Sequence, residues 1–163
     1  MWTIEMLSDS PSHLTAVREL VREYILLPDA SVNRDALPKR LPTFFVDKIA
    51  ALPFPSQLPD GDIAVAIEEG RAFGTGLLVP FESSKAELKW LYVKSDMRTL
   101  GVGREIVGAL IRVAKELGYR SVVLDVMPSR ADAISLYRSV GFNPAPAFKH
   151  YESHEMLFFE LVL

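Results

Sequence analysis

The chain has 163 residues, a net charge of −3, 49% hydrophobic residues and no cysteine. This length suits one domain over residues 1–163, this composition excludes a disordered chain, and the lack of cysteine excludes disulfides, thiolate metal sites and a cysteine nucleophile. The negative charge offers no footprint for nucleic acid, and no apolar run approaches the roughly 20 residues that cross a bilayer.

The first residues lack the basic and then apolar profile of a signal peptide, so we expect a cytoplasmic protein with no membrane partner.

Residues 3–7 favour a short strand, and the apolar spacing over residues 11–27 predicts a helix. Six of the 11 prolines fall within residues 28–59, where we expect only a short helix around residues 43–52. This proline-rich segment is either one wall of a substrate site or a surface connection.

The middle of the chain predicts strands followed by a long helix. Two strand-like runs, residues 62–68 and 71–79, flank a glutamate-glycine turn, which predicts a hairpin. Residues 86–93 favour the next strand. A helix follows over residues 101–117, with its apolar side chains on one stripe and Gly118 suited to its C-terminal cap.

The last third predicts a strand, a helix and a final strand. The apolar run at residues 121–126, interrupted only by Asp125, is typical of a strand covered on both faces. Ser129 and Asp132 have the spacing of a capping box for the helix that follows, and residues 156–163 favour the last strand. The whole order predicts a mixed α/β sheet with helices on both faces, and the consecutive hairpins argue against an all-parallel sheet.

Residues 98–104, Arg-Thr-Leu-Gly-Val-Gly-Arg, lead from a strand into the long helix. A short glycine-containing loop before a helix exposes unpaired backbone N–H groups at the positive end of the helix dipole, which suits a phosphate or pyrophosphate. A P-loop would need lysine where Arg104 stands, and a dinucleotide fingerprint would need a third glycine at Ile106. Both of these sites are therefore excluded.

Four features occur in a fixed order here: Leu91-Tyr92-Val93 at a strand end, Arg98-x-x-Gly101-x-Gly103, the apolar helix after it, and Ala133-x-x-x-Tyr137-x-x-x-Gly141-Phe142. Together they resemble the GCN5-related N-acetyltransferase (GNAT) superfamily. The resemblance covers residues 86–142 closely and the strand order of the whole chain loosely. It implies an acyl-CoA N-acyltransferase fold of mixed α+β class, with a twisted, mostly antiparallel central sheet and helices on both faces.

The resemblance also implies acetyl-CoA as co-substrate and no metal. Backbone N–H groups from Thr99 to Arg104 would cradle the pyrophosphate, where glycines allow close approach of the backbone. The pantetheine arm would lie along Leu91 to Val93 like an added strand, and a backbone N–H there would polarise the thioester carbonyl. The implied cofactor-binding residues are Leu91, Tyr92, Val93, Arg98, Thr99, Leu100, Gly101, Val102, Gly103, Arg104, Ala133 and Tyr137.

Three positions depart from the family pattern. Thr99 stands where many relatives carry glycine, and we expect it to stiffen the loop without abolishing binding. Arg130 stands where many relatives carry asparagine. Lys89-Trp90 stands where close relatives carry Lys-Arg, so the contacts of that arginine are not carried over.

Acyl transfer to an amine needs a base, because a lysine-like amine with a pKa of about 10.4 must be neutral to attack, at a cost of about 4–5 kcal/mol at pH 7. Glu87, on a strand beside the expected cleft, is the candidate base, with a water relay as the other route. It stands 11 residues before Arg98, and this spacing matches the catalytic glutamate of the histone-acetylating branch. The alternative is an exposed strand carboxylate paired with Lys85 or Lys89.

Tyr137 matches the family tyrosine that assists the departing thiolate, through a hydrogen bond that stabilises charge as it develops. The alternative is a core aromatic on the apolar stripe of its helix. Trp90 and Tyr92 share one face of their strand by alternation, and we expect them to pack beneath the helices.

The remaining polar residues have weaker patterns. His13, His150 and His154 are the only histidines, and they lack metal-ligand spacing with carboxylates. His150 and Tyr151 either reach the acceptor pocket or, as we favour, lie on a solvated loop. Asp125 needs a partner if it is buried, either a local backbone turn or a basic group, and is not expected to be catalytic.

We therefore predict an N-acetyltransferase in which the amine attacks acetyl-CoA directly, since cysteine is absent and no serine lies in a nucleophile elbow. One alternative is a non-catalytic acyl-CoA-binding or regulatory module, and another is an enzyme that uses a longer acyl group or an oxygen acceptor. Residues 24–60 and 143–155 would select the acceptor, a small-molecule or peptide amine. Phe44 and Phe45 either wall its site or, as we favour, pack in the core. The sequence leaves a homodimer open, with the last strand as the candidate contact.

Overall fold

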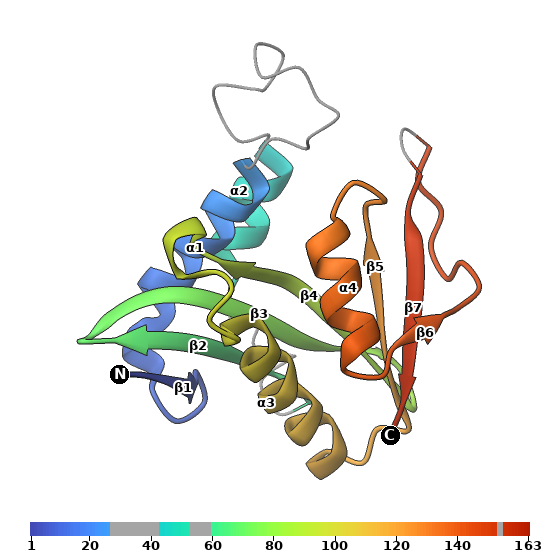
Figure 1. Ribbon diagram of the computed structural model, residues 1–163, viewed down its shortest axis with the longest axis horizontal. Helices are drawn as coiled ribbons and strands as arrows, with labels where there is room; N and C mark the ends of the chain where they lie inside the picture. The colour runs from blue at the N-terminus through green and yellow to red at the C-terminus, as the bar shows by residue number, and fades with distance from the viewer. Residues whose placement is uncertain (27–42, 53–59, 153–154) are drawn as a thin grey trace.

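The computed structural model describes residues 1–26, 43–52, 60–152 and 155–163. Seven strands form one sheet in the order β1-β2-β3-β4-β5-β7-β6 (Figure 1). The strands are β1 (Trp2–Met6), β2 (Asp62–Glu68), β3 (Arg71–Glu82), β4 (Lys85–Val93), β5 (Ser121–Val126), β6 (Asn143–Pro144) and β7 (Leu157–Val162). The helices are α1 (Leu14–Leu26), α2 (Thr43–Ala50), α3 (Val102–Glu116) and α4 (Ala131–Ser139), with 3₁₀ turns at Pro11–His13 and Ser95–Met97.

Within this described part, β4 and β5 are the one parallel pair of neighbouring strands, and the other pairs are antiparallel. The predicted mixed, mostly antiparallel sheet is therefore confirmed. The α3 helix makes the crossover from β4 to β5, as a parallel connection requires. In Figure 1, α3 and α4 lie on the near face of the sheet and α1 on the far face.

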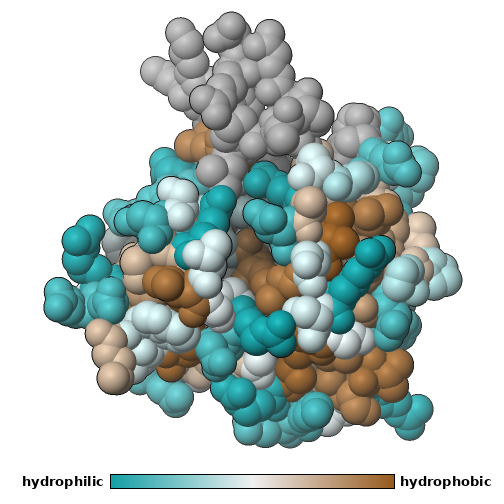
Figure 2. All heavy atoms as spheres, in the orientation of Figure 1, coloured by the Kyte–Doolittle hydropathy of each residue, from teal (hydrophilic) through white to brown (hydrophobic). Residues whose placement is uncertain are grey.

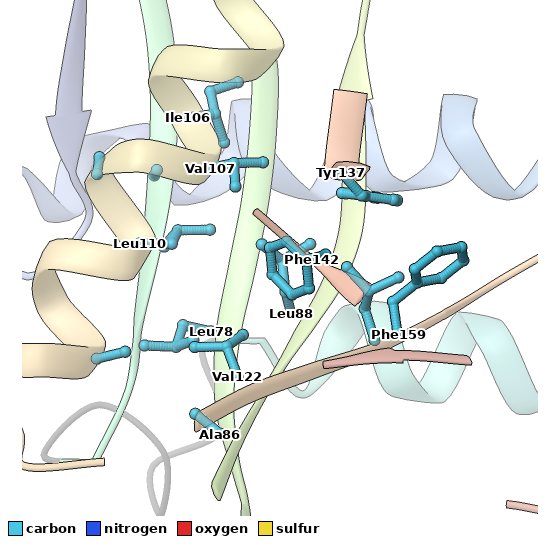
Figure 3. Close-up of a cluster of buried hydrophobic side chains, with 14 of the residues drawn as sticks. Leu78, Ala86, Leu88, Ile106, Val107, Leu110, Val122, Tyr137, Phe142 and Phe159 are labelled. Carbon is cyan, nitrogen blue, oxygen red and sulfur yellow. The ribbon is translucent and has the colours of Figure 1, made fainter. Parts of the chain in front are cut away.

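α3 lies close to the sheet because the strands beneath it carry small residues. Ala64 and Ala66 of β2 and Gly74 and Gly76 of β3 lie on this face. A Cβ added at Gly76 would stand 2.8 Å from Cγ2 of Ile106, which is closer than carbon atoms pack without strain. Figure 3 shows this core extending from Ile106 and Leu110 of α3 to Tyr137 of α4 and Phe159 of β7.

The opposite face carries a second core under α1 and α2. Val17 and Val21 of α1 and Ile49 of α2 pack against Ile63 and Val65 of β2. Because successive strand residues alternate between faces, β2 supplies small residues to one core and branched residues to the other. This is why its sequence is apolar almost throughout.

β4 contains a bulge near its middle. Thr75 of β3 is registered with Tyr92 and Leu77 with Lys89, so two residues of β4, Trp90 and Leu91, lie opposite a single residue of β3. Trp90 has a φ of 50°, the left-handed backbone that lets one strand take up the extra residue. Because of the bulge, Lys89 and Trp90 do not alternate as regular strand neighbours do.

The predicted capping box of the fourth helix is wrong. α4 begins at Ala131 with Arg130 as its N-cap, and no side chain caps it. The backbone N–H of Arg130 donates to the carbonyl of Met127 at 3.0 Å, so a turn occupies the residues ahead of the helix. Ser129 therefore lies one residue too early to cap the first turn.

Two other boundaries differ from prediction. Residues 11–13 form a 3₁₀ turn and α1 begins at Leu14, while residue 27 lies outside the described part. β7, predicted over residues 156–163, is one residue shorter at each end. It pairs with β5 and, over two residues, with β6. None of the helices in the described ranges is long and apolar enough to cross a membrane.

Candidate active site

β4 and β5 separate at the centre of the sheet. Their parallel pairing ends at Glu87 and Val123. Beyond this point β5 stays paired with β7, whereas the β5-facing edge of β4 from Leu88 to Val93 has no strand partner among the described residues. Main-chain N–H and C=O groups on that edge have no strand partner in the described part of the chain and can pair with a ligand, apart from the Val93 carbonyl, which accepts from Arg98. Figure 2 shows the same face hollowed near its centre, with an apolar floor and hydrophilic surface on both sides.

The loop after β4 presents backbone N–H groups in one direction. Thr99, with φ 67°, and Gly101, with φ 80°, have left-handed backbone, and Gly101 is the N-cap of α3. The carbonyl of Gly101 accepts the hydrogen bond of Glu105 at 3.1 Å. Three N–H groups of the first turn have no acceptor within the described residues, those of Val102, Gly103 and Arg104. With the positive end of the helix dipole they form an anion-binding geometry.

The two arginines that flank this loop are both engaged. Arg98 Nε donates to the carbonyl of Val93 at 2.9 Å, and its guanidinium carbon lies 5.9 Å from the centre of the Tyr92 ring. Arg104 donates to Ser139 Oγ at 2.8 Å. Arg98 therefore fixes the corner between β4 and the loop, and Arg104 ties the first turn of α3 to the last turn of α4.

Tyr137 of α4 lies in the core cluster that also holds Leu88 of β4 (Figure 3). It is buried, and its ring contacts that of Phe142 edge-on at a centroid distance of 5.8 Å. Burial raises the pKa of its hydroxyl, and Tyr24 and Asp125 add to the rise. The structure thus confirms that Tyr137 is a core aromatic. Ala133, one helical turn earlier, packs half-buried against the same cluster.

Glu87 is buried rather than exposed, and its main partner was not anticipated. Its carboxylate contacts Lys149 Nζ and lies 3.6 Å from Lys89 Nζ. Lys149 Nζ is also 3.5 Å from Asp125 Oδ2, which accepts a hydrogen bond from Tyr151 at 2.5 Å. We call these five residues the Glu87 cluster. It lies where the pairing of β4 with β5 ends, so it stands at the start of the open edge.

Of the two lysines expected as alternative partners of Glu87, Lys89 pairs with it and Lys85 does not. Lys85 pairs with Glu160 at 3.2 Å and not with Glu87. Burial lowers the pKa of Lys89, while Glu87 opposes this effect. Burial raises the pKa of the Tyr151 hydroxyl, and its hydrogen bond to Asp125 acts in the same direction.

A second polar group joins α1 to the end of β4. Tyr92 donates to Glu23 Oε2 at 3.1 Å, and Lys94 Nζ lies 3.4 Å from Glu23 Oε1. The rings of Tyr24 and Tyr92 are 6.3 Å apart between centroids, and the guanidinium carbon of Arg130 lies 5.9 Å from the centre of the Tyr24 ring. The prediction that Tyr92 packs beneath a helix is confirmed. Its partners on α1 carried no sequence signal, because they lie about 70 residues away along the chain.

The remaining predictions divide. His150 is exposed, as favoured, but the solvated-loop interpretation is wrong for Tyr151, which is held against Asp125. Phe44 and Phe45 belong to α2, and their side chains lie outside the described part. Across the described ranges, no group of three or more histidine, aspartate or glutamate side chains is close enough to hold a metal ion.

Comparison with known proteins agrees with this geometry. The model of the acetyltransferase (GNAT) family matches residues 30–142. The chain belongs to this family. An uncharacterised N-acetyltransferase of Schizosaccharomyces pombe is 36% identical over 94 residues, which are 56% of this chain and 58% of that protein. The N-alpha-acetyltransferase of Sulfurisphaera tokodaii is 28% identical over 127 residues, 74% of this chain and 75% of that one.

The first relatives are longer than the part matched here. The chain spans 58% of the length of the S. pombe protein and 36% of a Dictyostelium discoideum relative. Solved structures share the GNAT fold: an acetyltransferase of Streptococcus agalactiae has a TM-score of 0.77 at 17% identity, covering 99% of this chain and 98% of that one. The yncA protein of Salmonella typhimurium, solved with its cofactor acetyl-CoA, has a TM-score of 0.75 at 20% identity, covering 99% and 94%.

Proposed function

We propose that this GNAT family member is an acetyl-CoA-dependent N-acetyltransferase that acts on a primary amine of a small molecule or peptide. One observation carries the proposal. The unpaired edge of β4, from Leu88 to Val93, runs into a loop and helix start whose N–H groups have no acceptor in the described structure. An extended arm with a diphosphate at one end has the shape and polarity that these two features can bind together.

The donor site follows from the order of these features. The diphosphate of coenzyme A would accept hydrogen bonds from the first turn of α3, and the pantetheine arm would add to the β4 edge along Leu91 to Val93. Arg98 supports the site by holding the corner of the loop through the Val93 carbonyl. A backbone N–H of β4 would polarise the thioester carbonyl. The acetyl-CoA complex of the yncA protein supports this choice of donor.

Bound acetyl-CoA supplies an activated acyl group, and the protein supplies the proton transfers. Glu87 accepts a proton from the incoming ammonium, directly or through water, so that the neutral amine can form the new N–C bond. Tyr137 keeps its proton because burial raises its pKa, so it can donate a hydrogen bond to the sulfur as the C–S bond breaks. The nitrogen loses a second proton as the amide forms. The thiolate takes up one of these two protons and the other leaves to solvent, so the transfer releases one proton overall.

The acceptor class rests on relatives. The S. tokodaii protein is an N-alpha-acetyltransferase, and an Escherichia coli relative, 36% identical over 67 residues, acts on an alanine of ribosomal protein bS18. These names support an amine acceptor, including one borne on a peptide. The second candidate function is an acyl-CoA-binding module without turnover. It is favoured by the Glu87 carboxylate being already engaged by two lysines.

Thiol release from acetyl-CoA with a panel of amines separates the two functions. We expect release with at least one amine, and Tyr137→Phe should lower kcat by about 10- to 100-fold with little change in KM for acetyl-CoA. A matched control is Tyr119→Phe, because Tyr119 bonds the carbonyl of Asp60 away from the site. Binding of acetyl-CoA by calorimetry without turnover of any amine would favour the module, and absence of binding would overturn both functions.

A further inference from the structure

The Glu87 cluster holds one ammonium group between two carboxylates. Lys149 Nζ contacts Glu87 Oε1 and lies 3.5 Å from Asp125 Oδ2. The two acids come from different strands, β4 and β5, at the point where these strands separate. The side chain of Glu87 is only 5% exposed, whereas that of Lys149 is 25% exposed. Glu87 is thus buried within the sheet, Asp125 is 19% exposed beside it, and the cation reaches both from the solvent side.

Glu87 and Asp125 belong to paired strands of the sheet, whereas Lys149 does not belong to a strand. Lys149 lies 62 residues from Glu87 along the chain, within residues 145–152, which form neither helix nor strand. In contrast, the nearby Lys85–Glu160 pair joins two strands of the sheet. Lys149 can therefore leave its partners without breaking strand pairing, but Glu87 and Asp125 cannot move apart from the sheet. A second ammonium group can take the same position.

Aromatic rings surround the same ammonium. Lys149 Nζ lies 5.9 Å from the ring centre of Phe81 and 5.7 Å from that of Phe148, distances at which a cation is attracted to a ring. The two rings contact each other at 5.0 Å, and Phe158 packs on Phe148 at 4.9 Å. Carboxylates at one end and rings along the side fit an ammonium group on an apolar stem.

We propose that Glu87 and Asp125 form the subsite for the acceptor's ammonium group, and that Lys149 fills this subsite until an acceptor displaces it. The acceptor that fits best is a primary amine on an unbranched aliphatic chain, such as a lysine side chain or an alkyl diamine, because this is the chemistry of the present occupant. That the incoming ammonium belongs to an acetyl acceptor rests on the proposed function. The ammonium subsite itself does not, since it follows from the contacts of Lys149.

The subsite also orders the steps of the reaction. An arriving ammonium exchanges places with that of Lys149, so charge in the cluster is unchanged. Glu87 then takes one proton from the bound ammonium, and the neutral nitrogen attacks the thioester. Lys149 is thus an internal competitor of the acceptor. Its removal should lower KM for an alkylamine, by about 10-fold or more if Lys149 occupies the subsite most of the time.

Rescue of a Lys149→Ala variant by small amines tests the subsite without acetyl-CoA. The variant should melt at a lower temperature than the wild type, because it leaves buried Glu87 without its closest cation. We expect n-butylammonium chloride to recover at least about half of that loss, and n-butanol or sodium chloride at equal concentration to recover none. Adding Glu87→Gln should abolish the rescue. Lys85→Ala, which breaks the Lys85–Glu160 pair, is the matched control and should not be rescued.

Each outcome decides the inference. Equal effects of n-butylammonium and sodium chloride on Lys149→Ala would overturn it, as would rescue that survives Glu87→Gln. Should the alanine variant not fold, Lys149→Met keeps the apolar stem, and methylammonium against methanol replaces the probe with the same expected selectivity. Rescue without acetyl transfer to any amine would leave the subsite standing and reject the proposed function. Acetyl transfer to an amine without rescue of Lys149→Ala would support the proposed function and overturn the ammonium subsite.

Discussion

The hydroxyl of Tyr137 illustrates how one residue links burial to stability. Burial is the first cause of its raised pKa, with Tyr24 and Asp125 adding to it. In the unfolded chain this pKa returns to about 10, so the folded chain holds the proton more tightly. The stabilising contribution is therefore complete below a pH of about 10 and is lost as the pH rises toward the folded pKa.

Tyr137→Phe should remove this alkaline dependence. We expect the free energy of unfolding of the wild type to fall more steeply above a pH of about 10 than that of the variant, whatever their difference at neutral pH. Urea unfolding over a series of alkaline buffers measures both slopes. Equal slopes would show that Tyr137 titrates in the folded protein as it does in the unfolded chain.

At the scale of elements, features set by neighbouring residues could be predicted from the sequence, whereas features set by strand pairing could not. The β4 strand was predicted within one residue of its bounds, and the anion-binding geometry at the start of α3 follows from Gly101 and its neighbours. The bulge at Trp90 was not predictable, since it depends on how β3 pairs across from it. The start of α4 was missed because a turn from Met127 to Arg130 took the place of a side-chain cap.

The open edge of β4 makes a prediction for amide hydrogen exchange. Peptides covering residues 88–93 should exchange more slowly once acetyl-CoA is added, because a bound pantetheine arm would pair with N–H groups that have no strand partner in the described structure. Peptides covering residues 62–68 of β2 serve as the control, since β2 is paired on both sides. Slowing of β2 to the same extent, or no slowing of β4, would contradict the proposed position of the arm.

At the scale of the whole molecule, the described residues form two hydrophobic cores, and the Glu87 cluster joins distant segments of the chain. The cores were predictable in outline from alternation along strands such as β2. The Glu87 cluster was not, because it joins residues of β4, β5 and the segment before β7. Glu87 could be selected from its spacing to Arg98, whereas Lys149 lies in a segment with no motif. Contacts between distant segments need the fold before they can be recognised.

A pair of glycine substitutions tests how tightly α3 is fitted to the sheet. Gly76→Ala should lower the free energy of unfolding by about 1–3 kcal/mol, because the added Cβ would meet Cγ2 of Ile106 at 2.8 Å. Gly108→Ala should raise it by up to about 1 kcal/mol, since that glycine lies inside α3 and its nearest neighbour is a flexible Arg112 nitrogen at 3.7 Å. Chemical denaturation of both variants gives the comparison. A neutral Gly76→Ala would mean that the helix can shift away from the strands at little cost.

The short pairing of β4 with β5 has a mechanical consequence. Three registered residue pairs, ending at Glu87 and Val123, are all that this ladder contributes to joining β1–β4 with β5–β7. A force that pulls these two halves apart would act mainly on this short ladder. A ligand hydrogen-bonded along β4 beyond Glu87 would add contacts between the two halves. Binding of the donor would then raise the force needed to separate β4 from β5, where the sheet has its shortest central ladder.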